Sequence, residues 1–150
     1  MKTLVQRVSE ASVEVDGEIV GRIGRGLVAY VGVEPGDAEA DALTTARKLA
    51  EMRVFPGRTP MDLDIREVHG ALLVISQFTL MASLRRGRRP SFEGAATPEL
   101  ARTLYERVCS ALRDAGLEVQ QGRFAAHMIV RQVGDGPVSI PIATQGGALL

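Results

Sequence analysis

The sequence has one cysteine and two histidines, which limits the chemistry it can support. Cys109 has no partner for an internal disulfide, and three such side chains are too few for a usual zinc site. No apolar run approaches the roughly 20 residues of a membrane-spanning helix, and the first residues lack the apolar segment of a signal peptide. We therefore expect a cytoplasmic protein with no membrane contact that needs no metal, cofactor or disulfide.

Net charge is also absent, because 18 basic residues balance 18 acidic ones. Overall electrostatics therefore give no indication of a nucleic-acid partner. The kind and spacing of the basic residues say slightly more, since 16 of them are arginine and a guanidinium fork suits phosphate. One closely spaced group is a candidate RNA contact: Arg85, Arg86, Arg88 and Arg89.

Three common catalytic signatures are missing. The chain has no G-x-x-x-x-G-K-[ST] loop and no G-x-G-x-x-G after a strand, which argues against nucleotide hydrolysis and dinucleotide binding. No G-x-S-x-G elbow surrounds Ser76. A serine or threonine nucleophile needs a base within hydrogen-bond reach, and only His69 and His127 could pair with Ser76 or Thr79. A side-chain triad is therefore not favoured.

The strands are indicated by short periodic segments. Alternation in residues 3–15, the dipeptide Asp16-Gly17 and the segment Glu18–Ile23 predict a hairpin, and a third strand follows at Leu27–Val33. Arg53–Phe55 is a short strand candidate. Three more strands are expected at Leu117–Gln121, Met128–Val133 and Val138–Ala143, with a turn at residues 134–137 between the last two.

The first of two helices is predicted from about Ala38 to Met52. Asp37 is its expected N-cap. The apolar face should be formed by Leu43, Ala46, Leu49 and Ala50.

The second helix should begin at Pro98, with Thr97 as N-cap, and end near Gly116. Cys109 lies beside its apolar stripe, where packing is favoured over reactivity. The chain, residues 1–150, is thus predicted to be one α+β domain: an antiparallel-rich sheet, barrel-like in shape, with two packed helices.

The most apolar run, Ala71–Ile75, predicts a buried central strand. It ends in the segment Ser76-Gln77-Phe78-Thr79-Leu80, which brings hydroxyls, an amide and free backbone N–H groups to the edge of the core. Rigid strand ends often position a site. From this stretch alone, a strand that merely reaches the surface remains the favoured interpretation, just as an ordinary trans-proline turn does for Gly136-Pro137.

Five motifs taken together change that balance. In order along the chain, they are Gln6-Arg7-Val8 with Ala11-Ser12-Val13, Ser76–Leu80, Arg89-Pro90-Ser91-Phe92, Gly122–Ala126 with Met128, and Asp135-Gly136-Pro137-Val138. Their order and spacing resemble the bacterial and eukaryotic D-aminoacyl-tRNA deacylase family nearly from end to end. Three positions depart from the family pattern: Gly134 replaces asparagine, Ser139 replaces threonine, and His127 replaces an acidic residue.

The resemblance implies a homodimeric enzyme that hydrolyses the ester between a D-amino acid and the terminal adenosine of tRNA. Ser76, Gln77, Phe78 and Thr79 would line the catalytic pocket, with backbone N–H groups near Phe78 stabilising the oxyanion. The adenosine side would be shaped by Phe124, Ala126 and Met128.

The resemblance also implies how chirality is read. Gly136-Pro137 would adopt the cis form and enter the partner subunit's pocket, where backbone carbonyls leave no room for an L side chain. Glycyl-tRNA should then be hydrolysed as well. Arg7 would support this motif, although an ordinary ion pair explains it equally well. Separately from the resemblance, the charge of the arginine group at residues 85–89 predicts that it holds tRNA phosphates.

Two other functions stay open. One is an editing deacylase of the same fold that removes a wrong L-amino acid or glycine from tRNA. The other is a non-catalytic module that binds RNA or a small molecule.

Overall fold

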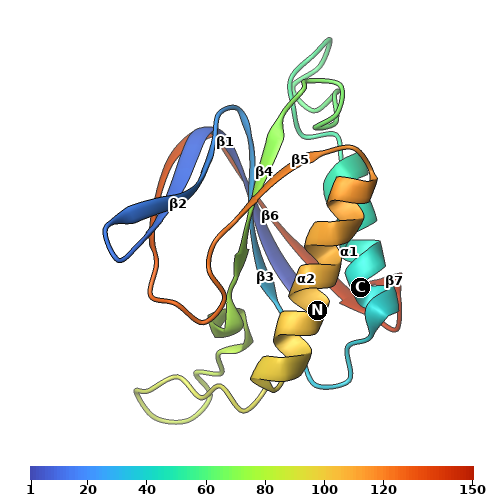
Figure 1. Cartoon of the computed structure of the whole chain (residues 1–150). Helices are drawn as coiled ribbons and strands as arrows, with labels where there is room; N and C mark the ends of the chain where they lie inside the picture. The colour runs from blue at the N-terminus through green and yellow to red at the C-terminus, as the bar shows by residue number, and fades with distance from the viewer.

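Seven strands form one curled sheet, and two helices pack on one of its faces (Figure 1). The structure is a computed structural model that describes residues 1–150 throughout. Strand order is β5-β4-β3-β1-β6-β7, and β2 pairs with the far end of β1. The elements are β1 (Lys2–Val15), β2 (Glu18–Ile23), β3 (Gly26–Gly32), α1 (Glu39–Glu51), β4 (Ala71–Ser76), the 3-10 turn η1 (Phe78–Met81), α2 (Pro98–Asp114), β5 (Glu118–Gln121), β6 (Ile129–Gln145) and β7 (Ala148–Leu149).

The centre of the sheet combines both strand directions. The hairpin of β1 and β2 is confirmed, and β1 also runs antiparallel to β3 and β6. β4, however, is parallel to both of its neighbours, β3 and β5, because α1 and α2 provide the crossovers that parallel neighbours need. The antiparallel-rich sheet is therefore not confirmed. The sheet is mixed, within an α+β fold that forms a half-barrel.

The three strands predicted after α2 are only partly correct. β5 is present, but residues 129–145 form one long strand, β6, which passes through residues 134–137 without turning. β1 pairs with β6 on both sides of that segment, and two register shifts next to Val8 absorb the irregular residues. The segment is thus a bulge within a paired strand, and the predicted turn is wrong.

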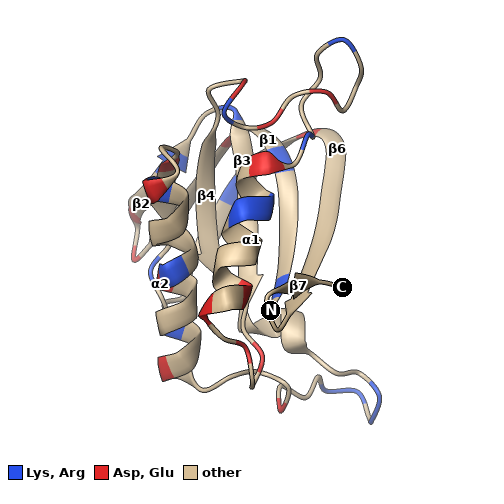
Figure 2. Cartoon of the chain, turned by 90° about the vertical axis from the view of Figure 1, so that its right-hand side faces the viewer, with Lys and Arg blue, Asp and Glu red and all other residues tan.

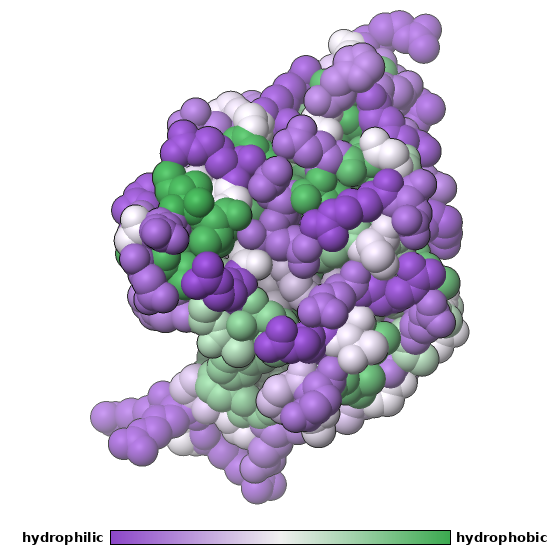
Figure 3. All heavy atoms as spheres, in the orientation of Figure 1, coloured by the Kyte–Doolittle hydropathy of each residue, from purple (hydrophilic) through white to green (hydrophobic).

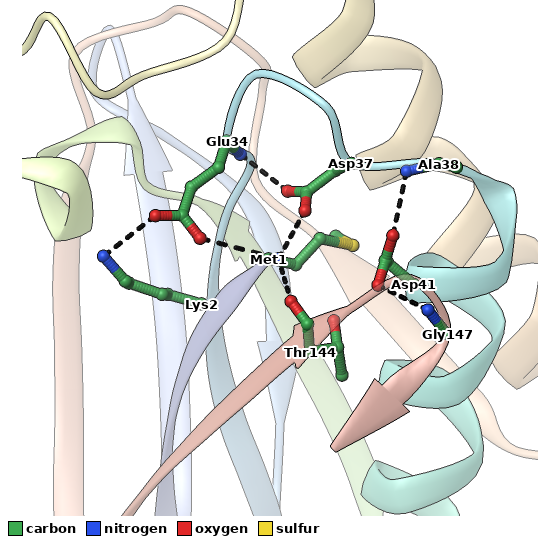
Figure 4. Close-up of polar contacts among 8 residues, drawn as sticks. All are labelled: Met1, Lys2, Glu34, Asp37, Ala38, Asp41, Thr144 and Gly147. Carbon is green, nitrogen blue, oxygen red and sulfur yellow. Dashed lines mark hydrogen bonds and ion pairs between the residues drawn. The ribbon is translucent and has the colours of Figure 1, made fainter. Parts of the chain in front are cut away.

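The first helix, α1, begins within one residue of its predicted start, but the predicted N-cap is wrong. Its N-cap is Ala38, whose backbone N–H donates to Asp41 Oδ2 at 3.0 Å. Asp37 cannot cap the helix, because its carboxylate is taken by the Met1 ammonium and by the backbone N–H of Glu34, each at 2.6 Å (Figure 4). Leu43 faces outward, 39% exposed, while Ala42 takes a buried place on the helix.

The N-terminal ammonium lies inside the fold. Besides its ion pair with Asp37, it donates to the carbonyl of Thr144 at 2.7 Å, and Met1 is only 1% exposed (Figure 4). Burial on its own would raise the pKa of the neighbouring Asp41, but backbone N–H groups of Gly147 and Ala38 bring that pKa below its usual value. These contacts tie β1, the start of α1 and the end of β6 together.

The second helix agrees with its prediction. Thr97 Oγ1 accepts from the backbone N–H of Leu100, Pro98 is the first helical residue, and Gly116 follows the helix with a φ of +82°. Of the predicted strand at residues 53–55, only Phe55 pairs, through a single bridge to Leu63.

The main core lies between the helices and the sheet (Figure 2). β4 is buried on both faces: Leu72 and Val74 belong to the helix-side core, and Leu73 and Ile75 to a smaller cluster beneath β2. A strand buried on both sides is what its continuous apolar run predicts. The end of β4 is therefore held rigidly from both faces.

Candidate active site

A largely apolar cavity of about 570 Å³ opens where β4 ends. Ile75 to Phe78 form one wall, and the backbone N–H of Gln77 donates to the carbonyl of Val31 at 2.8 Å, which fixes the strand end against β3. Figure 3 shows the surface hollowed on this side, between the lobe containing β2 and the projecting segment at the lower left. The other lining residues are Val31, Gly32, Val33, Ala95, Ala96, Pro98, Ala101, Phe124, Ala125, Ala126, His127, Met128 and Val130.

The structure brings most of the sequence-predicted pocket residues together. Ser76, Gln77 and Phe78 line the cavity, as do the three residues assigned to the adenosine side: Phe124, Ala126 and Met128. Thr79 is exposed and is not part of the lining. Its hydroxyl accepts a hydrogen bond from the side-chain amide of Gln77.

The cavity contains no paired nucleophile and base. His127 lines it, but the structure gives neither His127 nor His69 a hydrogen bond to Ser76 or Thr79. Burial raises the pKa of the Cys109 thiol to about 12, so the thiol stays protonated within the core, in agreement with the predicted packing role. Besides the His127 imidazole, the polar groups that face the cavity are hydroxyl, amide and backbone groups, and no base is hydrogen-bonded to a hydroxyl there.

Tyr105 lies behind the cavity and connects two of its walls. Its buried hydroxyl donates to the carbonyl of Val74 at 2.9 Å, and the backbone N–H of Gly122 donates to the same carbonyl at 3.2 Å. The Tyr105 ring also lies 6.1 Å from that of Phe124, centroid to centroid, and the guanidinium of Arg102 lies 4.6 Å from the centre of the Phe124 ring. The wall after β5 is therefore anchored to the strand that delivers Ser76.

We expect Tyr105→Phe to lower the free energy of unfolding by about 1 kcal/mol, measured by urea denaturation. The loss stays modest because the Val74 carbonyl keeps the bond from Gly122. Tyr30→Phe is the matched control, since its hydroxyl makes one longer bond, 3.4 Å to Gln132, and we expect it to cost less. Equal losses in the two variants would contradict this account of Tyr105.

Gly136-Pro137 lies on the exposed bulge of β6 and does not line the cavity of its own chain. The Gly136–Pro137 peptide bond is cis. This position has no room for a side chain: Gly136 has a φ of +137°, and a Cβ added to it would lie 2.8 Å from the backbone nitrogen of Val138. Ser139 accepts a hydrogen bond from the side-chain amide of Gln6 at 3.1 Å.

Arg7 is buried beside this bulge. Its Nε donates to the carbonyl of Asp135 at 3.0 Å and lies 3.3 Å from the Asp135 carboxylate. Its Nη1 donates to the carbonyl of Val54 at 2.5 Å. Arg7 thus joins the bulge to the body of the molecule and also forms an ion pair. Its contacts are compatible both with support of the Gly136-Pro137 motif and with an ordinary ion pair.

The wall formed by Val31–Val33, Ala95, Ala96 and Ala101 was not foreseen from the sequence. The backbone N–H of Ala96 donates to the carbonyl of Val33 at 3.0 Å. These residues contribute small or apolar surface and no reactive group. The run of small residues directly before the helix signal at Thr97 was the one available hint.

No group of three or more His, Cys, Asp or Glu side chains is placed to hold a metal ion. Neither helix combines the length and the apolar character required to cross a membrane.

Comparison with known proteins gives consistent results. A family model described as D-Tyr-tRNA(Tyr) deacylase matches residues 4–143. A D-aminoacyl-tRNA deacylase of Geobacter sulfurreducens is 47% identical, with 97% of this chain and 96% of the relative covered. A protein of the same name from Anaeromyxobacter dehalogenans is 50% identical, with 93% and 95% covered.

Two solved structures are also similar. One, a protein named c-Myc DNA Unwinding Element Binding Protein, has a TM-score of 0.90 and 32% identity, covering 97% of this chain and 100% of that one. A probable eukaryotic D-amino acid tRNA deacylase has a TM-score of 0.80 at 17% identity, covering 93% and 97%. The second likeness concerns the fold alone.

Proposed function

We propose a catalytic route and a basis for stereoselectivity for this chain, which belongs to the D-Tyr-tRNA(Tyr) deacylase family. Its activity is that of a D-aminoacyl-tRNA deacylase, a hydrolase acting on aminoacyl-tRNA. One observation carries the proposed route: the cavity at the end of β4 offers hydroxyl, amide and backbone N–H groups, and its one histidine, His127, is not hydrogen-bonded to Ser76 or Thr79. A site of this kind suits catalysis by orientation and oxyanion stabilisation.

In the proposed route, the ester carbonyl lies against the start of η1. The first backbone N–H groups of a helical turn have no partner within the turn, and Phe78 and Thr79 occupy that place in η1. These groups would donate to the carbonyl oxygen as it becomes an oxyanion, while the tRNA's own ribose hydroxyl assists proton transfer. The adenosine would rest against Phe124, Ala126 and Met128.

Stereoselectivity would come from a second copy of the chain. Gly136-Pro137 is exposed, outside its own cavity and braced by Arg7 through Asp135. A rigid, exposed backbone segment of this kind is suited to entering the cavity of a partner in a homodimer. Its carbonyls would bind the substrate's α-amino group and exclude an L side chain, so the enzyme would act as a chiral proofreader in the cytoplasm.

A deacylation assay with one matched pair of D- and L-aminoacyl-tRNA tests this function. Multiple turnover of the D substrate, with the L substrate left intact, is the expected result. Preferential turnover of the L substrate would instead identify an editing enzyme for a wrong L-amino acid.

We expect Thr79→Ala to retain activity within about tenfold of the unaltered enzyme, the cost of one neutral hydrogen bond. Thr79 does not line the cavity, and its hydroxyl is engaged by Gln77. Single-turnover deacylation rates provide the measurement. An acyl-enzyme trapped on Thr79 or Ser76 by acid quench and mass spectrometry would overturn the proposed route.

A non-catalytic nucleic-acid-binding role is the second candidate, favoured because the structural relative at 32% identity is named as a DNA-binding protein. Turnover at substoichiometric protein would exclude it as the chain's main function.

A further inference from the structure

Residues 82–95 leave the cavity wall, form a projecting loop and return to the wall. Figure 1 shows the loop extending from the body below η1, and Figure 2 shows basic residues at its tip. Two backbone hydrogen bonds close its neck: Ser83 N–H to the carbonyl of Ser91 at 2.8 Å, and Ser91 N–H to that of Ser83 at 2.9 Å. We call the segment between them, Leu84–Pro90, the arginine loop.

The four arginines of this loop are free of acidic partners. Arg85, Arg86, Arg88 and Arg89 are exposed, and none of them forms an ion pair. Several other arginines of the chain do pair with carboxylates, for example Arg107 with Glu39 at 2.6 Å. Four unpaired guanidinium groups within five residues repel one another, which leaves the loop suited to a polyanion.

Aromatic side chains occupy the root of the loop. Phe92, just beyond the neck, packs edge-to-face on Phe78, with 4.9 Å between ring centroids. Phe78 lines the cavity and is nevertheless 56% exposed. Between the cavity and the tip of the loop, the surface is therefore first apolar, then aromatic, and finally positively charged.

We propose that Phe78, Phe92 and the arginine loop bind the unpaired nucleotides that precede the terminal adenosine of the substrate. The bases would stack on the aromatic pair, and the phosphates would bind the arginines. Aromatic rings beside a positive groove are the common means of holding single-stranded nucleic acid. This inference rests on the proposed function, since it takes the cavity to hold the terminal adenosine.

The dimensions favour the unpaired end over the base-paired stem. Gly87, at the tip, is four residues from either side of the neck, so the loop reaches at most roughly 14 Å beyond it. That reach covers the few nucleotides next to the cavity. A partly exposed aromatic pair also has little to stack on in a duplex, where the bases are already stacked on one another. Phosphate contacts carry no sequence information, which suits an enzyme that acts on many tRNAs.

The test compares two D-aminoacyl substrates that differ only in the proposed contacts: D-aminoacyl-adenosine and a D-aminoacyl trinucleotide ending in CCA. We expect the ratio of their kcat/KM values to favour the trinucleotide at low salt. The variant Arg85→Gln/Arg86→Gln/Arg88→Gln/Arg89→Gln should reduce that ratio at least tenfold. With two linking phosphates, the trinucleotide's log kcat/KM should fall with log salt with a slope of about −1.4, and the variant should flatten this slope.

A control and a second variant separate phosphate binding by the arginines from base stacking on the aromatic pair. Arg58→Gln removes an exposed arginine from the segment between α1 and β4, which lies at the end of the molecule opposite the arginine loop (Figure 1), and should leave the ratio unchanged. Phe92→Leu should reduce the ratio at least fivefold through lost stacking while keeping the salt slope. A ratio that neither the fourfold arginine variant nor Phe92→Leu alters would overturn the proposal. An effect of these variants on full-length tRNA alone would also overturn it, because it would show that the loop binds the stem.

A negative result for the arginine loop can be distinguished from failure of the proposed function. If the unaltered enzyme hydrolyses neither of these D substrates nor full-length D-aminoacyl-tRNA, the proposed function has failed. Binding of the uncharged trinucleotide, measured by fluorescence titration against the same variants, still decides whether the arginine loop holds a single strand.

Discussion

D-Tyrosyl-, D-alanyl- and glycyl-tRNA should all be hydrolysed, while L-tyrosyl-tRNA should react at least about 10³-fold more slowly. The reason is steric. If the carbonyls of Gly136-Pro137 fix the α-amino group, the position of the substrate's Cβ alone decides acceptance. A contact that costs about 4 kcal/mol for the L isomer corresponds to this ratio. Glycine has no Cβ to exclude, and D side chains point away from the motif. Single-turnover rates for the four substrates provide the measurement.

A pocket that instead recognised the D side chain by direct contacts would give a different pattern. It would discriminate strongly between D-tyrosine and D-alanine and would spare glycine. Inertness toward glycyl-tRNA, together with steep selectivity among the D substrates, would therefore contradict steric exclusion at Gly136-Pro137.

Two inactive variants should restore activity when they form mixed dimers. Gly136→Ala should distort the motif, because its Cβ would lie 2.8 Å from the nitrogen and 2.9 Å from Cγ2 of Val138. Ala126→Phe should fill the cavity, which Ala126 lines. If the motif acts on the partner's cavity, a mixed dimer has one intact site, so an equal mixture should regain about a quarter of full activity.

The stoichiometry makes this experiment decisive. A motif that served its own chain would leave both sites of the mixed dimer defective, and no activity would return. Each variant alone, carried through the same unfolding and refolding, is the control. Sedimentation of the mixture confirms that dimers form, and full activity of an isolated monomer would contradict the dimeric site.

The sequence predicted the cavity wall at the end of β4 better than it predicted the path of the chain around it. The short apolar run before Ser76 predicts a strand buried on both faces, and Thr97-Pro98 predicts the start of a helix through its own capping chemistry. These signals depend on residues adjacent in sequence, so the structure keeps the elements that they predict. The wall at Val31–Val33 and Ala96 comes from distant segments with no distinctive side chains, and nothing local marks it.

The two wrong predictions, the turn at residues 134–137 and the N-cap at Asp37, failed because of contacts with residues distant in sequence. Gly134-Asp135-Gly136-Pro137 has the composition of a turn, yet β1 pairs with β6 before and after it and keeps the chain extended. Asp37 has the right chemistry for an N-cap, but the Met1 ammonium binds its carboxylate instead. In both cases a partner distant in sequence outcompeted the local preference.

The buried ammonium of Met1 has a practical consequence for preparing all of these variants. Any residue fused ahead of Met1 would turn the ammonium into a neutral amide. The Asp37 carboxylate, only 6% exposed, would lose its counter-charge, and a buried unpaired charge is strongly destabilising. An affinity tag therefore belongs after Leu150, which is 80% exposed. An amino-terminal tag whose cleavage leaves residues behind would depress every rate for reasons unrelated to catalysis.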